Sequence, residues 1–199
     1  MKLFSYVVRR DFGFAPNPFH QVCTLATCKP DIRKQAKIGD WVIGTGSANY
    51  PRGPDLRGRL VFAMKVNEVL SFDLYWNSPR FIRKRPNLRG SSKLRMGDNI
   101  YHSIDGNWVH VDSHHSHVGG VQNSNNIVRD TSKTTNVLVA NEFIYFGKEA
   151  IQIPQDHDVV KKGPSHRSNF DADEIHKFIS WLNGLGVSGF QAVPLKFPL

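Results

Sequence analysis

Cysteine is scarce in this chain, and long apolar runs are absent from it. Two cysteines in 199 residues, Cys23 and Cys28, are too few for a disulfide framework, so a reducing, cytoplasmic setting is expected. No apolar run approaches the roughly 18 residues that a membrane-spanning helix needs. The N-terminal residues, MKLFSYVVRRDFG, lack a small-residue cleavage site and are typical of a first strand rather than a signal peptide. The sequence therefore predicts no membrane partner.

Common catalytic and metal-binding signatures are also missing. The sequence has no P-loop, no GxGxxG after a strand and no GxSxG elbow. His20, Cys23 and Cys28 have the spacing H-x2-C-x4-C, which lacks an evident fourth zinc ligand. A divalent metal held by these residues or by the histidine-rich loop described below is an alternative that the spacing does not favour. The cofactor stays unknown.

The composition indicates an ordinary globular domain. Hydrophobic residues make up 40% of the chain and charged residues 22%, which excludes collagen, a coiled coil and a fully disordered chain. A length of 199 residues favours a single domain. We predict an α+β fold: a mixed, barrel-like sheet with a C-terminal amphipathic helix packed on it. Residues 1–154 would form the core, and residues 155–199 a linker, the helix and a tail.

Strand patterns dominate the first 150 residues. Alternation and β-branched content predict strands at Leu3–Arg9, Val22–Cys28, Trp41–Gly46, Arg59–Leu70, Asn107–Asp112 and Asn136–Phe146. A short helix is expected at Lys29–Lys37, and long polar loops at 77–100 and 113–135. Gly44 and Gly46 leave one strand face bare, which indicates either a bulge or close approach of a ligand.

One helix has a clear amphipathic pattern. Ile175, Phe178, Ile179 and Leu182 recur at helical spacing, and Gly184 and Gly186 supply its end. Asp171 is expected to cap this helix over 171–185, with Glu174 completing a capping box.

The positive charge is concentrated in one half of the chain. The net charge is +9, but residues 1–100 hold 18 lysines and arginines against 7 acidic residues. Clustered basic residues attract phosphates regardless of base sequence. The densest cluster predicts a polyanion-binding segment comprising Arg80, Arg83, Lys84, Arg85 and Arg89; the alternative is a solvated basic loop.

Histidines gather in a second segment. Five of the nine lie between residues 102 and 117, and imidazoles titrate near neutral pH. A reversal at Gly119-Gly120 could bring this half of the loop against a later Asn/Asp half, where Asp130 would orient an imidazole. If the protein is an enzyme, the candidate catalytic residues are His102, His114, His115 and Asp130.

Aromatic and polar side chains offer a base-binding surface. Phe12, Phe14, Phe19, Trp41 and Trp76 are candidate stacking platforms, although Phe19 and Trp41 are more typical of a core. The predicted ligand-binding residues combine such platforms with hydrogen-bonding groups: Arg10, Asp11, Phe12, Phe14, Asn17, Thr45, Ser47, Trp76, Tyr101, Asn123 and Asn126.

A set of long motifs resembles one known family. The motifs are YVVRRDFGFAPNPF, CTLATCKPDIR, GDWVIGTGS, YWNSPRF, GDNIYH, DSHHS and NSNNIVRD. They are similar to the nucleotide modification associated domain family, its second type, over residues 6 to about 154. This resemblance implies a setting in phage and bacterial genomes near genes that modify or restrict DNA bases.

A weaker resemblance concerns the fold. The order GDWVIGTGS, GRLVFAMKVNEVL and YWNSPRF is similar to PUA-like domains, in particular their EVE and ASCH branches. That resemblance implies a small mixed β-barrel that holds a modified base or an RNA nucleotide.

Two functions from different classes fit these observations. The first is a module that binds a nucleotide or a modified base in DNA, in a base-modification, restriction, anti-phage or counter-defence context. The second is an enzyme of nucleotide or DNA-base modification that uses the His/Asn/Asp loop. DNA or a nucleotide is the expected partner in both.

Overall fold

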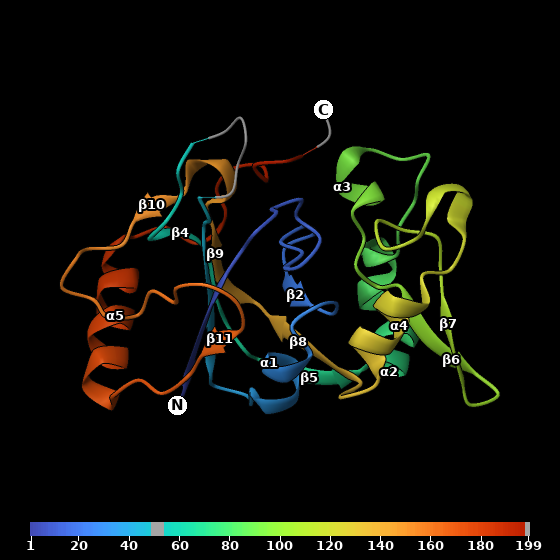
Figure 1. The fold of residues 1–199 in the computed structure, drawn as a ribbon, viewed down its shortest axis with the longest axis horizontal. Helices are drawn as coiled ribbons and strands as arrows, with labels where there is room; N and C mark the ends of the chain where they lie inside the picture. The colour runs from blue at the N-terminus through green and yellow to red at the C-terminus, as the bar shows by residue number, and fades with distance from the viewer. Residues whose placement is uncertain (49–53, 198–199) are drawn as a thin grey trace.

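A seven-stranded mixed sheet forms the centre of the computed structural model, which describes residues 1–48 and 54–197 (Figure 1). Its strand order is β11-β1-β3-β4-β9-β12, and β10 also pairs with β4. β1 is parallel to β3 and β12 is parallel to β9, whereas the other neighbours are antiparallel. The bounds are β1 (Leu3–Val7), β3 (Trp41–Thr45), β4 (Arg59–Lys65), β9 (Glu142–Tyr145), β10 (Ile151–Gln152), β11 (His166–Arg167) and β12 (Gly189–Phe190). The predicted single-domain α+β fold with a mixed sheet is confirmed, and within the described residues the sheet does not close into a barrel.

A smaller sheet and a hairpin complete the β structure. β2 (Cys23–Leu25), β8 (Asn136–Ala140) and β5 (Glu68–Ser71) form an antiparallel sheet in the order β2-β8-β5. β6 (Tyr101–Ile104) and β7 (Asn107–His110) form a separate hairpin. One core cluster joins the two larger sheets, with Val42 and Met64 from the first and Leu25 and Leu138 from the second.

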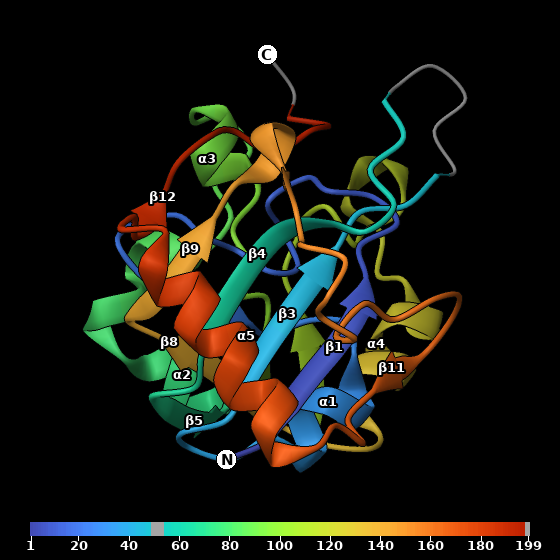
Figure 2. The same ribbon diagram turned by 90° about the vertical axis from the view of Figure 1, so that its left-hand side faces the viewer.

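The longest helix, α5 (Ala172–Gly184), covers one face of the central sheet (Figure 2). Its buried residues Ile175, Phe178 and Leu182 belong to the same core cluster as Trp41 and Ile43 of β3. The amphipathic pattern therefore predicted this helix and its buried face correctly. Asp171 occupies the N-cap position, but its side chain makes no capping hydrogen bond, so the predicted capping box is not formed.

Two predicted strands are each divided between the two sheets. The run Arg59–Leu70 becomes β4 and β5, and the run Asn136–Phe146 becomes β8 and β9. The two crossing points meet, because Asn67 Oδ1 accepts a hydrogen bond from the Asn141 backbone N–H at 2.6 Å. Each crossing falls on an Asn-Glu pair, Asn67-Glu68 and Asn141-Glu142, that interrupts the apolar alternation. Because the apolar pattern resumes directly after each pair, the prediction joined the two strands on either side into one.

The predicted long loops contain several short helices. The 3-10 helix η1 (Pro79–Lys84) and α3 (Ser92–Arg95) lie in the first, which follows directly on α2 (Phe72–Asn77). The second contains the 3-10 helix η2 (Val118–Gly120) and α4 (Ser124–Thr131), which begins after Asn123, whose side chain accepts from the Asn126 N–H. The remaining short elements are α1 (Pro30–Gln35) and the 3-10 helix η3 (Gly147–Glu149).

The glycines of β3 serve packing rather than ligand approach. A Cβ on Gly44 would lie 2.2 Å from the Phe62 ring and 2.6 Å from Val8, and the β3–β4 register shifts between Gly44 and Thr45. A Cβ on Gly46 would lie 2.2 Å from the Cβ of Leu56. A bulge therefore accounts for Gly44, whereas Gly46, just after β3, is approached closely by another stretch of backbone, 2.6 Å from the Leu56 carbonyl oxygen to its Cβ position, as the glycine pattern also allows.

None of the helices in the described ranges has the length and apolar character that crossing a membrane requires.

Candidate active site

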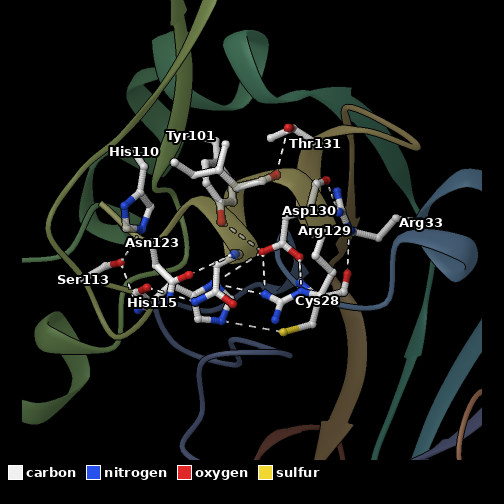
Figure 3. Close-up of polar contacts among 12 residues, drawn as sticks. Cys28, Arg33, Tyr101, His110, Ser113, His115, Asn123, Arg129, Asp130 and Thr131 are labelled. Carbon is white, nitrogen blue, oxygen red and sulfur yellow. Dashed lines mark hydrogen bonds and ion pairs between the residues drawn. The ribbon is translucent and has the colours of Figure 1, made fainter. Parts of the chain in front are cut away.

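A thiol, an imidazole and a carboxylate from three separate segments form one polar chain. His115 Nε2 lies 3.7 Å from Cys28 Sγ, and His115 Nδ1 lies 3.3 Å from Asp130 Oδ2 (Figure 3). Cys28 lies in the turn from β2 to α1, His115 in the loop after β7, and Asp130 near the end of α4. A nucleophile in contact with a base that is in turn held by a third group is the arrangement of covalent catalysis.

The Cys28 turn has an unusual backbone. Cys28 (φ 57°) and Lys29 (φ 42°) are both left-handed, although neither is glycine. Left-handed residues of this kind cost of order 1–3 kcal/mol each and persist where the surroundings hold them. Here the Cys28 N–H donates to Asp130 Oδ1 at 2.9 Å, and Arg33 Nε donates to the Cys28 carbonyl at 2.8 Å. The turn therefore presents the thiol in a fixed position.

Asp130 is fully buried and has four kinds of donor. It accepts from Arg129 Nε at 2.8 Å and Nη2 at 2.9 Å, from the Tyr101 hydroxyl at 3.0 Å, and from Cys28 and His115. Burial alone would raise its pKa, but the hydrogen bonds from His115 and Arg129 outweigh burial and hold the pKa well below its usual range. Asp130 is thus a carboxylate whenever the fold is intact near neutral pH.

The carboxylate determines how His115 acts. Burial lowers the pKa of His115, but the hydrogen bond to Asp130 and the contact with Cys28 raise it by more, so the net shift is upward. Arg129 Nη2 also lies 3.4 Å from Nδ1, but Arg129 already donates to both Asp130 oxygens. Nδ1–H therefore donates to Asp130, and Nε2 is the atom that accepts the thiol proton.

Further contacts position the histidine loop. The Ser113 hydroxyl accepts from the His115 N–H at 3.2 Å and contacts His110 Nε2 at 3.2 Å. Asn126 Nδ2 donates to the His115 carbonyl at 2.9 Å. The Phe14 ring centre lies 4.5 Å from that of His115. Amide, hydroxyl and aromatic contacts thus fix the imidazole from several sides.

Many of the sequence-predicted residues gather here. The two halves of the histidine loop do face each other, with His115 against Asp130. Phe12 and Phe14 pack on His114, with ring centres 4.5 and 5.3 Å away. The predicted residues that these contacts connect to His115 and Asp130, directly or through one neighbour, are Phe12, Phe14, Tyr101, His114, Asn123 and Asn126. Asn123 and Asn126 act on the backbone of the loop, which makes them positioning residues.

Other predicted residues lie elsewhere. His102 stacks on Trp76, with ring centres 4.2 Å apart, and the Arg85 guanidinium lies 3.8 Å from the Trp76 ring centre. Since neighbours along β6 point to opposite faces, Tyr101 reaches Asp130 and His102 does not. The Trp76 ring therefore packs against His102 and Arg85, whereas the prediction required it to stack on a base of the ligand.

Three predicted polar ligands lie inside the protein. Asn17 is buried and donates from Nδ2 to the Met96 carbonyl at 2.7 Å. Asp11 is buried against the Tyr145 hydroxyl. Thr45 is fully buried in the central sheet, whereas Ser47 is half-buried beyond its end. Phe19 and Trp41 are buried, as their alternative assignment to the core predicted.

The basic segment divides into different environments. Lys84 is buried, and its ammonium donates to the Asn17 side chain and to the Val22 carbonyl, each at 2.7 Å, which places it away from the surface that polyanion binding needs. Arg80 pairs with Glu68 at 2.8 Å. Arg83 and Arg89 are exposed, as is Arg10 in the N-terminal segment.

Cys28 is the central residue that sequence reasoning missed. Its position was visible as the junction between a predicted strand and a predicted helix, but nothing local linked it to a base that lies 87 residues away. Among the residues that the structure describes, no group of three or more His, Cys, Asp or Glu side chains is arranged to hold a metal ion.

Comparison with known proteins gives one match. The family model described as nucleotide modification associated domain 2 matches residues 1–199, the whole chain. No curated protein and no solved structure matches the sequence or the fold.

Proposed function

Because the chain belongs to the nucleotide modification associated domain 2 family, we propose that it is an enzyme of nucleotide or DNA-base modification whose nucleophile is the Cys28 thiol. The observation that carries this proposal is the chain of contacts from Cys28 Sγ through His115 to Asp130. The family supplies the substrate class, and the site supplies the reaction type. A setting beside DNA modification or restriction systems is part of the same proposal.

The geometry gives each residue a role. His115 Nε2 takes the thiol proton as Cys28 Sγ bonds to an electrophilic carbon of the nucleotide and displaces a leaving group from it, and the imidazolium gives that proton to the leaving group. Water or another nucleophile, deprotonated by His115, then attacks the same carbon and breaks the S–C bond, and the released thiolate takes the proton back from the imidazolium. Asp130 holds Nδ1–H and stabilises the charge on the imidazolium. Arg129 and Tyr101 keep Asp130 in place by donating to it.

The second cysteine shows what a purely structural thiol looks like in this fold. Cys23 is fully buried beside Met64, and burial raises the pKa of its thiol to about 12. Cys28 is half-buried and contacts an imidazole. Reactive cysteines are partly exposed in electropositive surroundings, whereas buried ones are inert.

Recognition of a nucleotide or modified base without chemistry is the second candidate, and one observation favours it. Two cations lie beside the thiol: burial acts to lower the pKa of Lys29 and of Arg129, and in both Cys28 acts against burial. Such charge suits binding of a phosphate-bearing ligand. A module that only binds has no need of the thiol.

Cysteine replacement separates the two functions. Wild-type protein, Cys28→Ser and the control Cys23→Ser are incubated with nucleoside monophosphates and with DNA oligonucleotides carrying modified pyrimidines. Product formation and mass added to the Cys28 peptide are measured by mass spectrometry. We expect Cys28→Ser to lose at least about a thousandfold in turnover, with Cys23→Ser close to wild type wherever it folds. Full turnover in Cys28→Ser, or binding of these ligands without any turnover in the wild type, would contradict the enzyme proposal.

His115→Ala gives a second criterion. In an enzyme, turnover falls while affinity for the nucleotide is largely kept, because His115 acts on the proton of the thiol. In a binding module, the affinity itself falls.

A further inference from the structure

A large groove lies apart from the thiol site. It has a volume of about 1190 Å³, and neither Cys28, His115 nor Asp130 lines it. The end of α5 and β12 line one side of the groove, and residues of η1 and α3 line the other. The C-terminal end of α5, β12 and α3 lie near one another at one edge of the molecule (Figure 2). The floor of the groove includes residues 141–144 and Phe19. The volume exceeds the ~300–1,000 Å³ that small-ligand sites span.

The groove carries uncompensated positive charge. Arg83 and Lys93 line it and are exposed. Within residues 1–48 and 54–197 neither of them pairs with a carboxylate, whereas Arg80 in the same wall pairs with Glu68. The carboxylate that lines the groove, Glu142, pairs with Lys65 at 3.0 Å. The free charge in the groove is therefore cationic, which complements phosphate.

His20, which also lines the groove, has a ring nitrogen that can form a hydrogen bond with a ligand. His20 (φ 60°) and its neighbour Gln21 (φ 66°) are both left-handed, and both line the groove. His20 Nε2 is buried without a hydrogen-bond partner among the described residues. Burial and the charges of Lys84, Arg83 and Lys93 lower the pKa of His20 to about 4, so the ring is neutral near pH 7. Strained residues with unsatisfied polar atoms are found where a ligand completes the bonding.

Aromatic surface adjoins the cations. Phe190 is half-buried in the groove wall, stacks on Tyr145 with ring centres 5.8 Å apart, and lies 5.1 Å from the Lys93 ammonium. The contact with the Phe190 ring therefore holds the Lys93 ammonium in the groove wall.

We propose that this groove binds the phosphate backbone of a nucleic-acid strand, with Arg83 and Lys93 on the phosphates and His20 Nε2 available for a hydrogen bond to the strand. The inference rests on the proposed function for its ligand class and adds a second site to it. The segment 14–20 joins the two sites, since Phe14 packs on His115 and His20 lines the groove. Six residue steps span at most about 21 Å, which is the length of about six stacked nucleotides at ~3.4 Å each. A short strand could therefore lie across the groove while one of its bases reaches the thiol.

Two double-alanine variants test the proposal in the full-length protein: one removes two positive charges from the groove, and the other removes the same charge from outside it. Binding of a fluorescein-labelled single-stranded thymidine oligonucleotide is followed by anisotropy over a series of salt concentrations. The groove variant is Arg83→Ala with Lys93→Ala. The control is Lys37→Ala with Arg95→Ala, which removes one lysine and one arginine from exposed positions that do not line the groove.

We expect the groove variant to bind about tenfold more weakly and its log–log salt slope to fall by about 1.4, because each lost phosphate contact contributes about 0.7 for single strands. The control should change little. Equal weakening in both variants, an unchanged groove variant, or no binding by the wild type would overturn the proposal. Competition with thymidine monophosphate separates a mononucleotide site, at which it displaces the oligonucleotide, from a strand site, at which it does not. The same titration in Cys28→Ala keeps this result independent of whether the thiol is catalytic.

Discussion

Two buried carboxylates, Asp98 and Asp130, lie in different surroundings. Their exposed fractions are 1% and 0%, and each accepts a hydrogen bond from a tyrosine hydroxyl, Tyr75 at 2.8 Å and Tyr101 at 3.0 Å. Burial raises the pKa of Asp98, with Lys84 opposing it only in part. For Asp130 the donors outweigh burial and the pKa is lowered.

The two networks end differently. The Asp98 network is closed: Thr24 donates to Asp98 at 2.6 Å and accepts from the buried Lys84 ammonium at 3.2 Å. The Asp130 network passes through His115 to a half-buried thiol. The difference teaches that a buried charge indicates chemistry only where its hydrogen bonds lead to a reactive atom that a substrate can reach. The Asp98 and Lys84 contacts stay within the interior, whereas Asp130 contacts an imidazole that faces a thiol.

The largest loss of stability is expected at the closed network. Lys84→Met leaves Asp98 buried without its nearby cation and removes the donor to Asn17, so the free energy of unfolding should fall by about 3–5 kcal/mol. Urea denaturation measures this. Arg83→Met, next to it but exposed, should stay within about 0.5 kcal/mol of wild type. If both variants are equally stable, Lys84 is not part of the interior network.

A somewhat smaller loss is expected for Asp130→Asn, about 2–4 kcal/mol at neutral pH, because Arg129 and His115 lose a carboxylate. The pKa of Asp130 lies below that of an unfolded aspartate, about 3.9. Its contribution is therefore complete above that value and is lost as the pH falls below it. The raised pKa of Asp98 acts in the opposite direction, since protonating Asp98 relieves its burial.

The free energy of unfolding, measured between about pH 2 and pH 7, should accordingly depend less on pH in Asp130→Asn than in wild type. An identical pH profile in both proteins would show that Asp130 is not the strongly acidic group of the fold.

The matched tyrosines should show the smallest effect. Tyr75→Phe removes the hydroxyl from Asp98 and should cost about 1.5–3 kcal/mol, as for a hydrogen bond to a charged group. Tyr101→Phe should cost about 1 kcal/mol or less, because Asp130 keeps its donors from Arg129, His115 and Cys28. Thermal and urea unfolding of the pair test the order. The reverse order would mean that Asp130 is less well satisfied than Asp98.

Local pattern predicted much of the fold. The period of Ile175, Phe178 and Leu182 located α5 because a helix presents such residues on one face. Alternation located β1, β3 and β4, but not the crossings at Asn67 and Asn141, because a short polar pair inside an apolar run does not by itself indicate that the chain moves to another sheet. Short helices such as η1 and α3 lie in polar sequence without a sufficiently long period.

The candidate site was predicted in part for the same reason. His115 and Asp130 fall within one loop and its helix, so proximity along the chain was enough to suggest their contact. Cys28 and Lys84 depend on contacts across 87 and 60 or more residues, which no local pattern encodes. The run of basic residues between Arg80 and Arg89 did not indicate that Lys84 is buried.

Alkylation of the two cysteines tests the central claim most directly. Wild type, His115→Ala and Asp130→Asn are treated with iodoacetamide at neutral pH, and modification of the Cys28 and Cys23 peptides is followed by mass spectrometry over time. The account predicts that Cys28 reacts far faster than Cys23 in the wild type. It also predicts that His115→Ala slows Cys28 by at least about a hundredfold, as removal of a general base does, with a smaller decrease in Asp130→Asn. A Cys28 rate that is the same in all three proteins would contradict activation of the thiol by His115.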